Sequence, residues 1–425
     1  MKQTEIGLIP DDWEVKRLGD VTRIQAGGTP STLFEAYWNG NIRWMNSGEL
    51  NLKRVYEVEG RITELGLNNS STHLIPKGCV LIGLAGQGKT RGTAAINYVD
   101  LCTNQSIAAI FPSNFHNSDF LYHVMDNKYQ ELRELSDGGG GRGGLNLKIL
   151  NDIQIPLPPL PEQQRIAKAL SDVDALIFTT EKLLQKKKNI KQGTMQELLT
   201  GKKRLPGFAK SNNTKMTELG EIPEDWEVKT LNELINDISD GPFGSNLKTE
   251  HYTTEREVRI IQLSNVGEDG WDNENVKYTT FTHAKEIQRC IVPYGSIVIA
   301  KMMPAGRAIL CPNKEKMYIL GSDCVRISPN NLLDSLFFMY FSKTSIYLNQ
   351  IKENTQGSTR ARTSVSKLKR IEIALPPKKE QNSIAKILSD MDNEIDLLNT
   401  KLEKYRNLKN AMMQQLLTGK IRLVK

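Results

Sequence analysis

Residues 157–174 read LPPLPEQQRIAKALSDVD, and 218 positions later residues 375–392 read LPPKKEQNSIAKILSDMD. The same offset carries MQELLTGKKRL (195–205) onto MQQLLTGKIRL (413–423). The two halves of the chain therefore end on the same blocks at the same spacing. Self-similarity at a fixed spacing is typical of a repeated architecture. The 425-residue chain is thus predicted to contain two copies of one scaffold.

The two halves also open alike. Residues 4–18 (TEIGLIPDDWEVKRL) and 217–231 (TELGEIPEDWEVKTL) are identical at 11 of 15 positions. Between these openings and the proline-rich blocks the halves diverge, and residues 19–155 and 232–373 are called here the first and second variable regions. A framework that is repeated at both ends and altered in the centre suggests one scaffold with two different recognition surfaces. Gene duplication followed by drift is the alternative.

A long helix is predicted after each proline-rich block. Apolar residues there recur at alternating intervals of three and four, which is the heptad pattern of a coiled coil, and charged residues occupy the outer faces. At about 35–40 residues, each helix spans on the order of 55 Å. Such a narrow seam needs a partner, so we expect an antiparallel coiled coil within the chain; helices docked on separate domains are the alternative. The seam residues are Ile166, Leu170, Val173, Ile177, Leu184 and Leu198, and then Ile384, Leu388, Met391, Ile395, Leu398, Leu402, Tyr405 and Leu416.

The variable regions contain short β-rich runs separated by glycine, asparagine and proline, with short helical patterns between them. CVLIGLAG (79–86) and SIVIAKMM (296–303) are examples of such runs. Each variable region is therefore expected to form a mixed α/β domain. The fold class follows as α+β, with two pseudo-twofold-related mixed domains joined by two long antiparallel helices.

Several loops of the variable regions combine glycine with basic and polar residues. Glycine lets a backbone approach a phosphate closely, and arginine or lysine can bind phosphates or guanine edges. At the 218-residue offset Gly88-Lys89 falls on Gly306-Arg307, and Arg142 falls on Arg360. Solvated hairpin tips are the alternative interpretation of these loops. The candidate DNA contacts are Thr29, Lys89, Thr90, Arg91 and Arg142 in the first region, and Ser245, Asn246, Lys248, Arg307, Arg360 and Arg362 in the second.

Residues 83–90 (GLAGQGKT) fit the phosphate-loop pattern GxxxxGK[ST] letter for letter. A phosphate loop must open a helix whose N-terminus faces the phosphates. Here Gly92 and a β-branched run follow, which favour a returning strand and hence a hairpin. The pattern is therefore rejected as a nucleotide site, and no other catalytic signature is found in the sequence.

Composition excludes several classes of protein. No apolar run approaches the ~18 residues that a membrane helix needs, and the N-terminus lacks a signal peptide, so a cytoplasmic location is expected. The five cysteines and five histidines are scattered, which favours reduced thiols and argues against a disulfide framework or a metal site. A net charge of +7 permits nucleic-acid binding without establishing it.

These features together resemble the specificity subunit of type I restriction–modification systems. The resemblance rests on the doubled IPxDWEV openings, the doubled LPPxxEQxxIAxxLSDxD blocks and the doubled LLTGKxRL ends, with GGTPS…YWNGNIRW (27–44) and DGPFGSNLK (240–248) in the variable regions. It implies target-recognition domains at residues 1–155 and 213–373, a central repeated region with a long helix at 156–212, and a C-terminal one at 374–425.

The resemblance also implies a non-catalytic role in the recognition of double-stranded DNA. Each half would recognise one half of a bipartite, asymmetric site, and the helices would set the spacer and dock two methyltransferase subunits. Restriction subunits that translocate DNA would complete the complex. No cofactor is implied for this chain, because S-adenosylmethionine, ATP and magnesium would belong to the partner subunits. The alternatives are a sequence-independent architectural DNA-binding protein, a scaffold without a DNA role, or an NTPase using residues 83–90.

Overall fold

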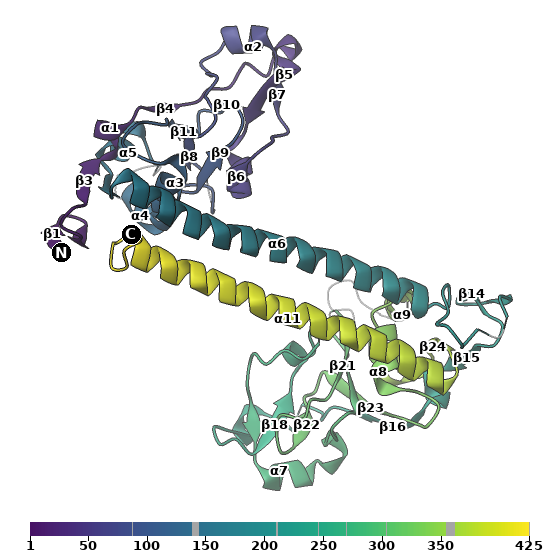
Figure 1. Ribbon diagram of the computed structural model, residues 1–425. Coiled ribbons are helices and arrows are strands. Elements are labelled where there is room, and N and C mark those ends of the chain that lie inside the picture. Colours follow the sequence, from purple (N-terminus) through teal and green to yellow (C-terminus); the bar gives the residue numbers. More distant parts are fainter. Residues whose placement is uncertain are drawn as a thin grey trace. The chain divides into compact units, whose positions relative to one another are not determined.

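The computed structural model describes residues 1–86, 88–137, 144–209, 211–244, 246–268, 270–302, 304–353 and 362–424. The chain divides into two compact units (Figure 1). The first comprises Met1–Lys182 with Asn399–Lys425, and the second comprises Leu183–Leu398. Each unit therefore takes its opening and its variable region from one half of the chain and a helix end from the other half.

The long helices are α6 (Leu160–Leu198) and α11 (Lys378–Leu416), and both are 39 residues in length. Figure 1 shows α6 in teal and α11 in yellow. Both begin directly after two consecutive prolines, Pro158-Pro159 and Pro376-Pro377, which end the preceding strand. Beyond each helix end a glycine with positive φ stops the helical conformation, Gly201 at 74° and Gly419 at 69°. Left-handed backbone of this kind is readily adopted by glycine. The predicted helices are confirmed.

Ion pairs within each unit show that the helices run antiparallel. In the first unit Asp174 of α6 contacts Lys409 of α11 at 2.8 Å, and Glu181 contacts Arg406 at 2.6 Å. In the second unit Lys187 contacts Glu394 at 2.6 Å, and Lys191 contacts Asp392. Residue numbers rise along α6 as the numbers of their partners fall along α11. Lys191 and Lys409 occupy equivalent polar positions in the predicted seam and take equivalent aspartates.

The structure places the seam residues on the inner faces of the helices. Within the first unit Ile166 and Leu170 share an apolar cluster with Leu416, and within the second unit Leu198 shares one with Ile384 and Leu388. The buried members are Ile166, Leu170, Val173, Leu198, Ile384, Leu388, Ile395, Leu402 and Leu416. The half-buried members are Ile177, Leu184, Met391, Leu398 and Tyr405.

The first variable region is built around a mixed sheet with strand order β4-β11-β8-β9-β6. Its strands are β4 (Ile24–Ala26), β11 (Ile107–Ile110), β8 (Val80–Gly83), β9 (Ala94–Asn97) and β6 (Arg54–Val55). A smaller sheet has the order β10-β5-β7, with β10 (Cys102–Thr103), β5 (Trp38–Met45) and β7 (Arg61–Ile62). The helices α3 (Ser118–Asn127) and α4 (Tyr129–Asp137) follow, and α3 packs against β8 and β9.

The second variable region repeats this plan. Its main sheet has the order β16-β23-β20-β21, from β16 (Ile235–Asp240), β23 (Cys324–Pro329), β20 (Ile297–Ala300) and β21 (Ala308–Leu310). The smaller sheet has the order β17-β19-β18-β22, from β17 (Tyr252–Thr253), β19 (Tyr278–Thr279), β18 (Val258–Ile261) and β22 (Tyr318–Leu320). The helices α8 (Ser335–Phe341) and α9 (Ser345–Glu353) follow. The expected mixed α/β domains are confirmed.

The opening of each half pairs with the strand that leaves its variable region. In the first unit β3 (Glu14–Arg17) is antiparallel to β12 (Gln154–Leu157). In the second, β15 (Glu227–Thr230) is antiparallel to β24 (Glu372–Leu375). Each variable region is thus closed at its base by the repeated segments. All five cysteines are buried and free. Across the described residues, no helix has the length and apolarity needed to cross a membrane.

A buried carboxylate near the start of each long helix binds the tail of the other helix. In the first unit Glu162 accepts hydrogen bonds from Arg422 Nε (2.7 Å) and Trp13 Nε1 (3.1 Å), and Arg422 also donates to Asp12 (2.7 Å). Glu162 is 1% exposed and Trp13 is 0% exposed. We call this set of four side chains the first clamp.

The second clamp has the same geometry. Glu380 accepts from Arg204 Nε (2.7 Å) and Trp226 Nε1 (3.2 Å), and Arg204 also donates to Asp225 (2.7 Å). Glu162 and Glu380 lie in the first turns of their helices, and Arg422 and Arg204 lie in the basic tails beyond the helix ends. The structure shows that both groups are occupied in fastening the helix ends to the openings.

Replacement of Arg422 by methionine should open the first clamp. Because it leaves the buried Glu162 carboxylate without its cation, we expect a loss of about 3 kcal/mol. Hydrogen exchange is the measurement: peptides around Trp13 and Glu162 should lose protection while those around Trp226 keep it. Arg406→Met is the matched control, since its pair with Glu181 is exposed and is worth under about 1 kcal/mol. Equal effects of both substitutions would contradict the clamp.

The first clamp should also make stability depend on pH. Burial raises the pKa of Glu162, but hydrogen bonds from Arg422 and Trp13 outweigh burial, and the net pKa is lowered. A lowered folded-state pKa stabilises the fold above the unfolded value of about 4.3, and that contribution is lost as the pH falls through the folded pKa. Urea unfolding of the wild type and Glu162→Gln should therefore differ most near pH 7 and converge below about pH 4. A difference that is constant with pH would argue against an ionised Glu162.

Candidate nucleic-acid interface

The described residues of the segment 83–90, which leave out residue 87, lie on a hairpin. Strand β8 ends at Gly83, and β9, which begins at Ala94, returns antiparallel to it. Near the tip of the hairpin, the Lys89 carbonyl accepts hydrogen bonds from Thr93 Oγ1 (2.6 Å) and Tyr129 Oη (3.2 Å). A strand therefore follows the glycine-rich segment where a phosphate loop would require a helix. The predicted hairpin is confirmed, and the Lys89 side chain is exposed on it.

The corresponding hairpin of the second variable region is shorter, which corrects the register expected from the sequence. Gly306 donates to the carbonyl of Ala300 (2.8 Å), as Gly92 donates to the carbonyl of Gly83 (2.9 Å). Both glycines have positive φ, 88° and 80°. Gly306 therefore corresponds to Gly92, and Arg307 corresponds to Thr93. The alignment of Gly88-Lys89 with Gly306-Arg307 is wrong, because the extra residues of the first hairpin precede its glycine turn.

A common backbone frame holds the loops of both regions. Gly27 donates to the carbonyl of Ile107 (3.0 Å), and Gly241 donates to that of Cys324 (2.9 Å). A Cβ atom at Gly27 would lie 2.2 Å from the Thr103 carbonyl oxygen, and one at Gly241 would lie 2.0 Å from that of Gly321. Only glycine fits such an approach. The quoted segments GGTPS and DGPFG thus begin equivalent loops.

The candidate residues of the first region lie near this frame. Thr29 is half-buried and donates from Oγ1 to Gln105 Oε1. Thr90 and Arg91 are half-buried beside the exposed Lys89 on the hairpin. Arg142 lies outside the described residues. Sequence reasoning missed Gln105, because no glycine or basic residue marks its loop.

The structure describes four of the six candidates of the second region, Asn246, Lys248, Arg307 and Arg362. Lys248 is 54% exposed, and the carbonyl of Asn246 accepts from His283 Nε2 (2.9 Å). Arg307 Nε donates to the Pro304 carbonyl (3.2 Å). Arg362 is 54% exposed and contacts Asp323 at 3.6 Å. Ser245 and Arg360 lie outside the described residues.

Half-buried ion pairs fix the first variable region on the long helices. Arg54 of β6 donates to Asp119 of α3 (2.7 Å) and to Asp174 of α6 (3.3 Å). Lys409 of α11 contacts Asp174 and also Asp126 of α3 (3.2 Å). In the second unit, Tyr340 Oη of α8 donates to Asp392 of α11 (2.7 Å). The candidate loops are therefore carried on a base with defined orientation within each unit.

Glutamine beside each clamp glutamate adds a further link. Gln163 accepts from the backbone of Asn117 (2.8 Å) and donates to the Phe115 carbonyl (3.1 Å). Gln381 accepts from Asp334 (2.9 Å) and donates to the Leu332 carbonyl (2.9 Å). Asn117 and Asp334 are the N-caps of α3 and α8. The repeated EQ pair thus joins each variable region to its own long helix.

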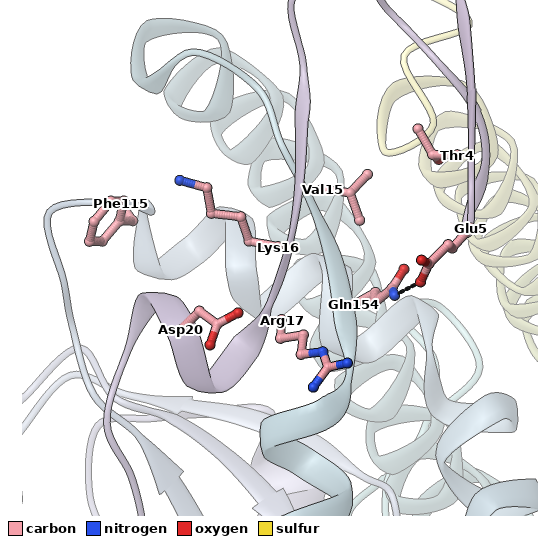
Figure 2. A pocket seen from close by; sticks show the side chains of 8 residues that line it. All are labelled: Thr4, Glu5, Val15, Lys16, Arg17, Asp20, Phe115 and Gln154. Atoms are coloured by element: carbon pink, nitrogen blue, oxygen red, sulfur yellow. Dashed lines mark hydrogen bonds between the residues drawn. The ribbon is translucent and has the colours of Figure 1, made fainter.

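A polar concavity of about 670 Å³ lies beside the first opening, at its strand β3 (Figure 2). Figure 2 shows Gln154 bonded to Glu5, and Lys16 lies 5.3 Å from the centre of the Phe115 ring. Phe115 is 51% exposed. No candidate DNA residue lines this concavity. In the described part of the chain, no group of three or more histidine, cysteine or acidic side chains is placed to hold a metal.

The sequence model of one protein family, the type I restriction modification DNA specificity domain, matches the chain twice, at residues 10–192 and 223–405. The chain belongs to this family. Both matches include an opening, a variable region and most of the following long helix. The specificity subunit therefore recognises DNA sequence within a restriction–modification complex, and its relatives are non-catalytic subunits.

Curated relatives and solved structures agree with this assignment. The specificity subunit is 26% identical over 420 residues to the type I restriction enzyme MjaVIII specificity subunit of Methanocaldococcus jannaschii, covering 98% of this chain and 94% of that one. It is 32% identical to the EcoR124I/EcoR124II specificity subunit of Escherichia coli over 38% of this chain and 41% of that one. The crystal structure of the S subunit from M. genitalium shares the fold, with a TM-score of 0.62, 15% identity and 98% coverage of both chains.

Proposed function

We propose that each unit of this specificity subunit recognises one half of a bipartite, asymmetric site on double-stranded DNA. The observation that carries the proposal is the repeated loop frame with unlike residues on it. Gly27 and Gly241 make the same backbone contacts in their units. The hairpins beside them differ in length and in side chains, so the same framework presents different groups to DNA.

The exposed groups of these loops suit a duplex. Lys89 and Lys248 are cations that can neutralise phosphates, which gives salt-dependent affinity without sequence preference. Asparagine, threonine and arginine can form hydrogen bonds to base edges. Because the groups differ between the units, the two half-sites are expected to differ in sequence.

We propose that the antiparallel helices set the spacer between the half-sites. Within the units, α6 and α11 are held in register by equivalent Lys–Asp pairs, Lys409 with Asp174 and Lys191 with Asp392. A buried or half-buried polar pair in an apolar seam favours one register over its alternatives. Each helix of 39 residues measures about 58 Å at 1.5 Å per residue.

Two methyltransferase subunits are proposed to dock on equivalent surfaces of the two units. Lys16 contacts Glu14 at 3.0 Å, and Lys229 contacts Glu227 at 3.0 Å. Near Lys16 lies Phe115, whose counterpart in the second unit is Leu332, 44% exposed. The same surface of a partner can bind either unit, because the two openings have similar sequences whereas the variable loops differ.

The chemistry is assigned to the partners. S-adenosylmethionine would be held by the methyltransferase subunits, and ATP and magnesium by restriction subunits that translocate DNA. Methylation mapping tests the whole proposal: the chain is co-expressed with the methyltransferase of its system, and the host DNA is sequenced for methyladenine. A single split, asymmetric motif with a fixed spacer is expected. An assembled complex that yields no new methylated motif would favour architectural DNA binding.

Lys89→Ala and Arg307→Ala should affect different half-sites. Each substitution removes one cation from one unit. The rate of methylation should therefore fall several-fold on DNA in which the half-site recognised by that unit carries an altered base. Paired oligonucleotides, each with one altered half-site, make the other half-site the internal control. Equal losses at both half-sites from either substitution would contradict separate recognition.

Insertion of one heptad into both helices should lengthen the accepted spacer. The insertions belong after Lys182 and Leu398, where the units divide. An insertion at the end of α6, near Gly201, is unsuitable because Gly201 packs against Pro223 and Trp226. Seven residues add about 10 Å, or roughly three base pairs. A heptad keeps the seam in phase. An unchanged spacer in the methylated motif of the assembled variant would remove the role of the helices as a ruler.

A further inference from the structure

The second variable region contains a buried ion pair at the loop frame. Lys301, directly after β20, contacts Asp240, the last residue of β16. The lysine side chain is 4% exposed and the aspartate is 33% exposed. Burial of a lysine is costly unless the charge is paired, and such pairs contribute little net stability compared with apolar residues of similar size. The pair therefore needs an explanation other than the stability of the fold.

The first variable region shows that the frame forms without this pair. Asp240 pairs with Val325 between β16 and β23. At the equivalent place in the first region, Ala26 pairs with Ala108 between β4 and β11. Lys301 donates from its backbone to the Asp323 carbonyl (2.8 Å), as Leu84 donates to that of Ser106 (2.8 Å). Ala26 and Leu84 thus occupy the places of Asp240 and Lys301. One scaffold accepts an apolar pair and an ionic pair at the same two positions.

The ion pair lies where the candidate DNA loops of the second unit meet. Thr363 donates from its backbone to the Lys301 carbonyl (2.9 Å), and Arg362 forms a β-bridge with Met302. Burial raises the pKa of the Cys324 thiol to about 12, and the charges of Asp323, Lys301, Arg307 and Asp240 also act on it. The pair therefore lies beside the loop that carries Arg362.

The more exposed member of the pair is the half-buried Asp240 carboxylate, and its chemistry restricts what it can bind. An ionised carboxylate only accepts hydrogen bonds, and it repels DNA phosphates. In the major groove the base-edge donors are the exocyclic amino groups, N4 of cytosine and N6 of adenine. Lys301 is only 4% exposed, so it can balance the charge of Asp240 while having little surface of its own to offer a ligand.

We infer that Asp240 accepts a hydrogen bond from the exocyclic amino group of cytosine or adenine in the second half-site, and that Lys301 is the residue that positions it. This inference rests on the proposed function and adds a specificity-determining carboxylate to it. The first unit, with Ala26 and Leu84, has no such acceptor at this place. The difference contributes to the asymmetry of the recognised site.

The test maps the methylated motif of the co-expressed complex for Asp240→Asn and for the double variant Asp240→Ala/Lys301→Leu. The double variant installs the residues of the first unit, which that unit already accommodates. The double variant should lose discrimination at one base position of one half-site, by roughly 5- to 150-fold for one good base contact, and keep the other half-site. Asp240→Asn retains an acceptor oxygen but adds an amide donor, so it should alter the preferred base at that same position. Lys301→Arg, which preserves the cation, should keep the wild-type motif.

Asp237→Asn is the matched control. Asp237 lies on the same strand and contacts Arg326, away from the loop frame, so its loss should leave the motif unchanged. An unchanged motif in both Asp240 variants would overturn the inference while the proposed function stands. Loss of methylation at every site by a folded, assembled Asp240→Asn complex would also overturn it, in favour of a structural role. A wild-type complex without a split motif would instead remove the proposed function.

Discussion

The bond between a buried glutamate and the arginine of the opposite helix tail is the constraint on which each unit depends. Glu162 and Glu380 are at most 1% exposed, and each would be a costly isolated charge without its arginine and tryptophan. Because the arginine comes from the other half of the chain, neither unit can close from its own half alone. Gly419 and Gly201 strengthen the link, since their close approach to Pro10 and Pro223 leaves no room for a side chain.

The clamps also explain why the openings and the tails of the halves are repeated while the variable regions are not. DWEV supplies the aspartate and tryptophan, EQ supplies the glutamate, and GKxRL supplies the glycine and arginine. These short motifs are distant in sequence and meet in one contact. Loss of the glutamate or the arginine would leave a charge unpaired, whereas a change at a hairpin tip alters only what the unit presents to solvent.

The fold was predictable from sequence where the spacing of apolar residues, or a proline or glycine at an element's end, determines it. The heptads, the proline exits and the terminal glycines define both helices, and the returning strand after Gly92 excludes a phosphate loop. The clamps were not predictable, because nothing local shows that Glu162 would meet Arg422 rather than cap its own helix. The predicted alignment of Gly88 with Gly306 was wrong for a related reason. A constant offset between the halves cannot locate an insertion, whereas the equivalent backbone hydrogen bonds of Gly92 and Gly306 do locate it.

The site itself was predictable only as a set of loops. Basic and glycine-rich segments are the regions proposed to contact DNA, and Lys89, Lys248 and Arg362 are exposed. They do not show which residues discriminate between bases, because a cation that binds phosphate and one that binds guanine look alike in sequence. Comparison of the two units supplies the missing criterion. Where the backbone contacts match and the side chains do not, as at Ala26 and Asp240, the fold does not impose the difference, and we propose such positions as the ones to test for base recognition.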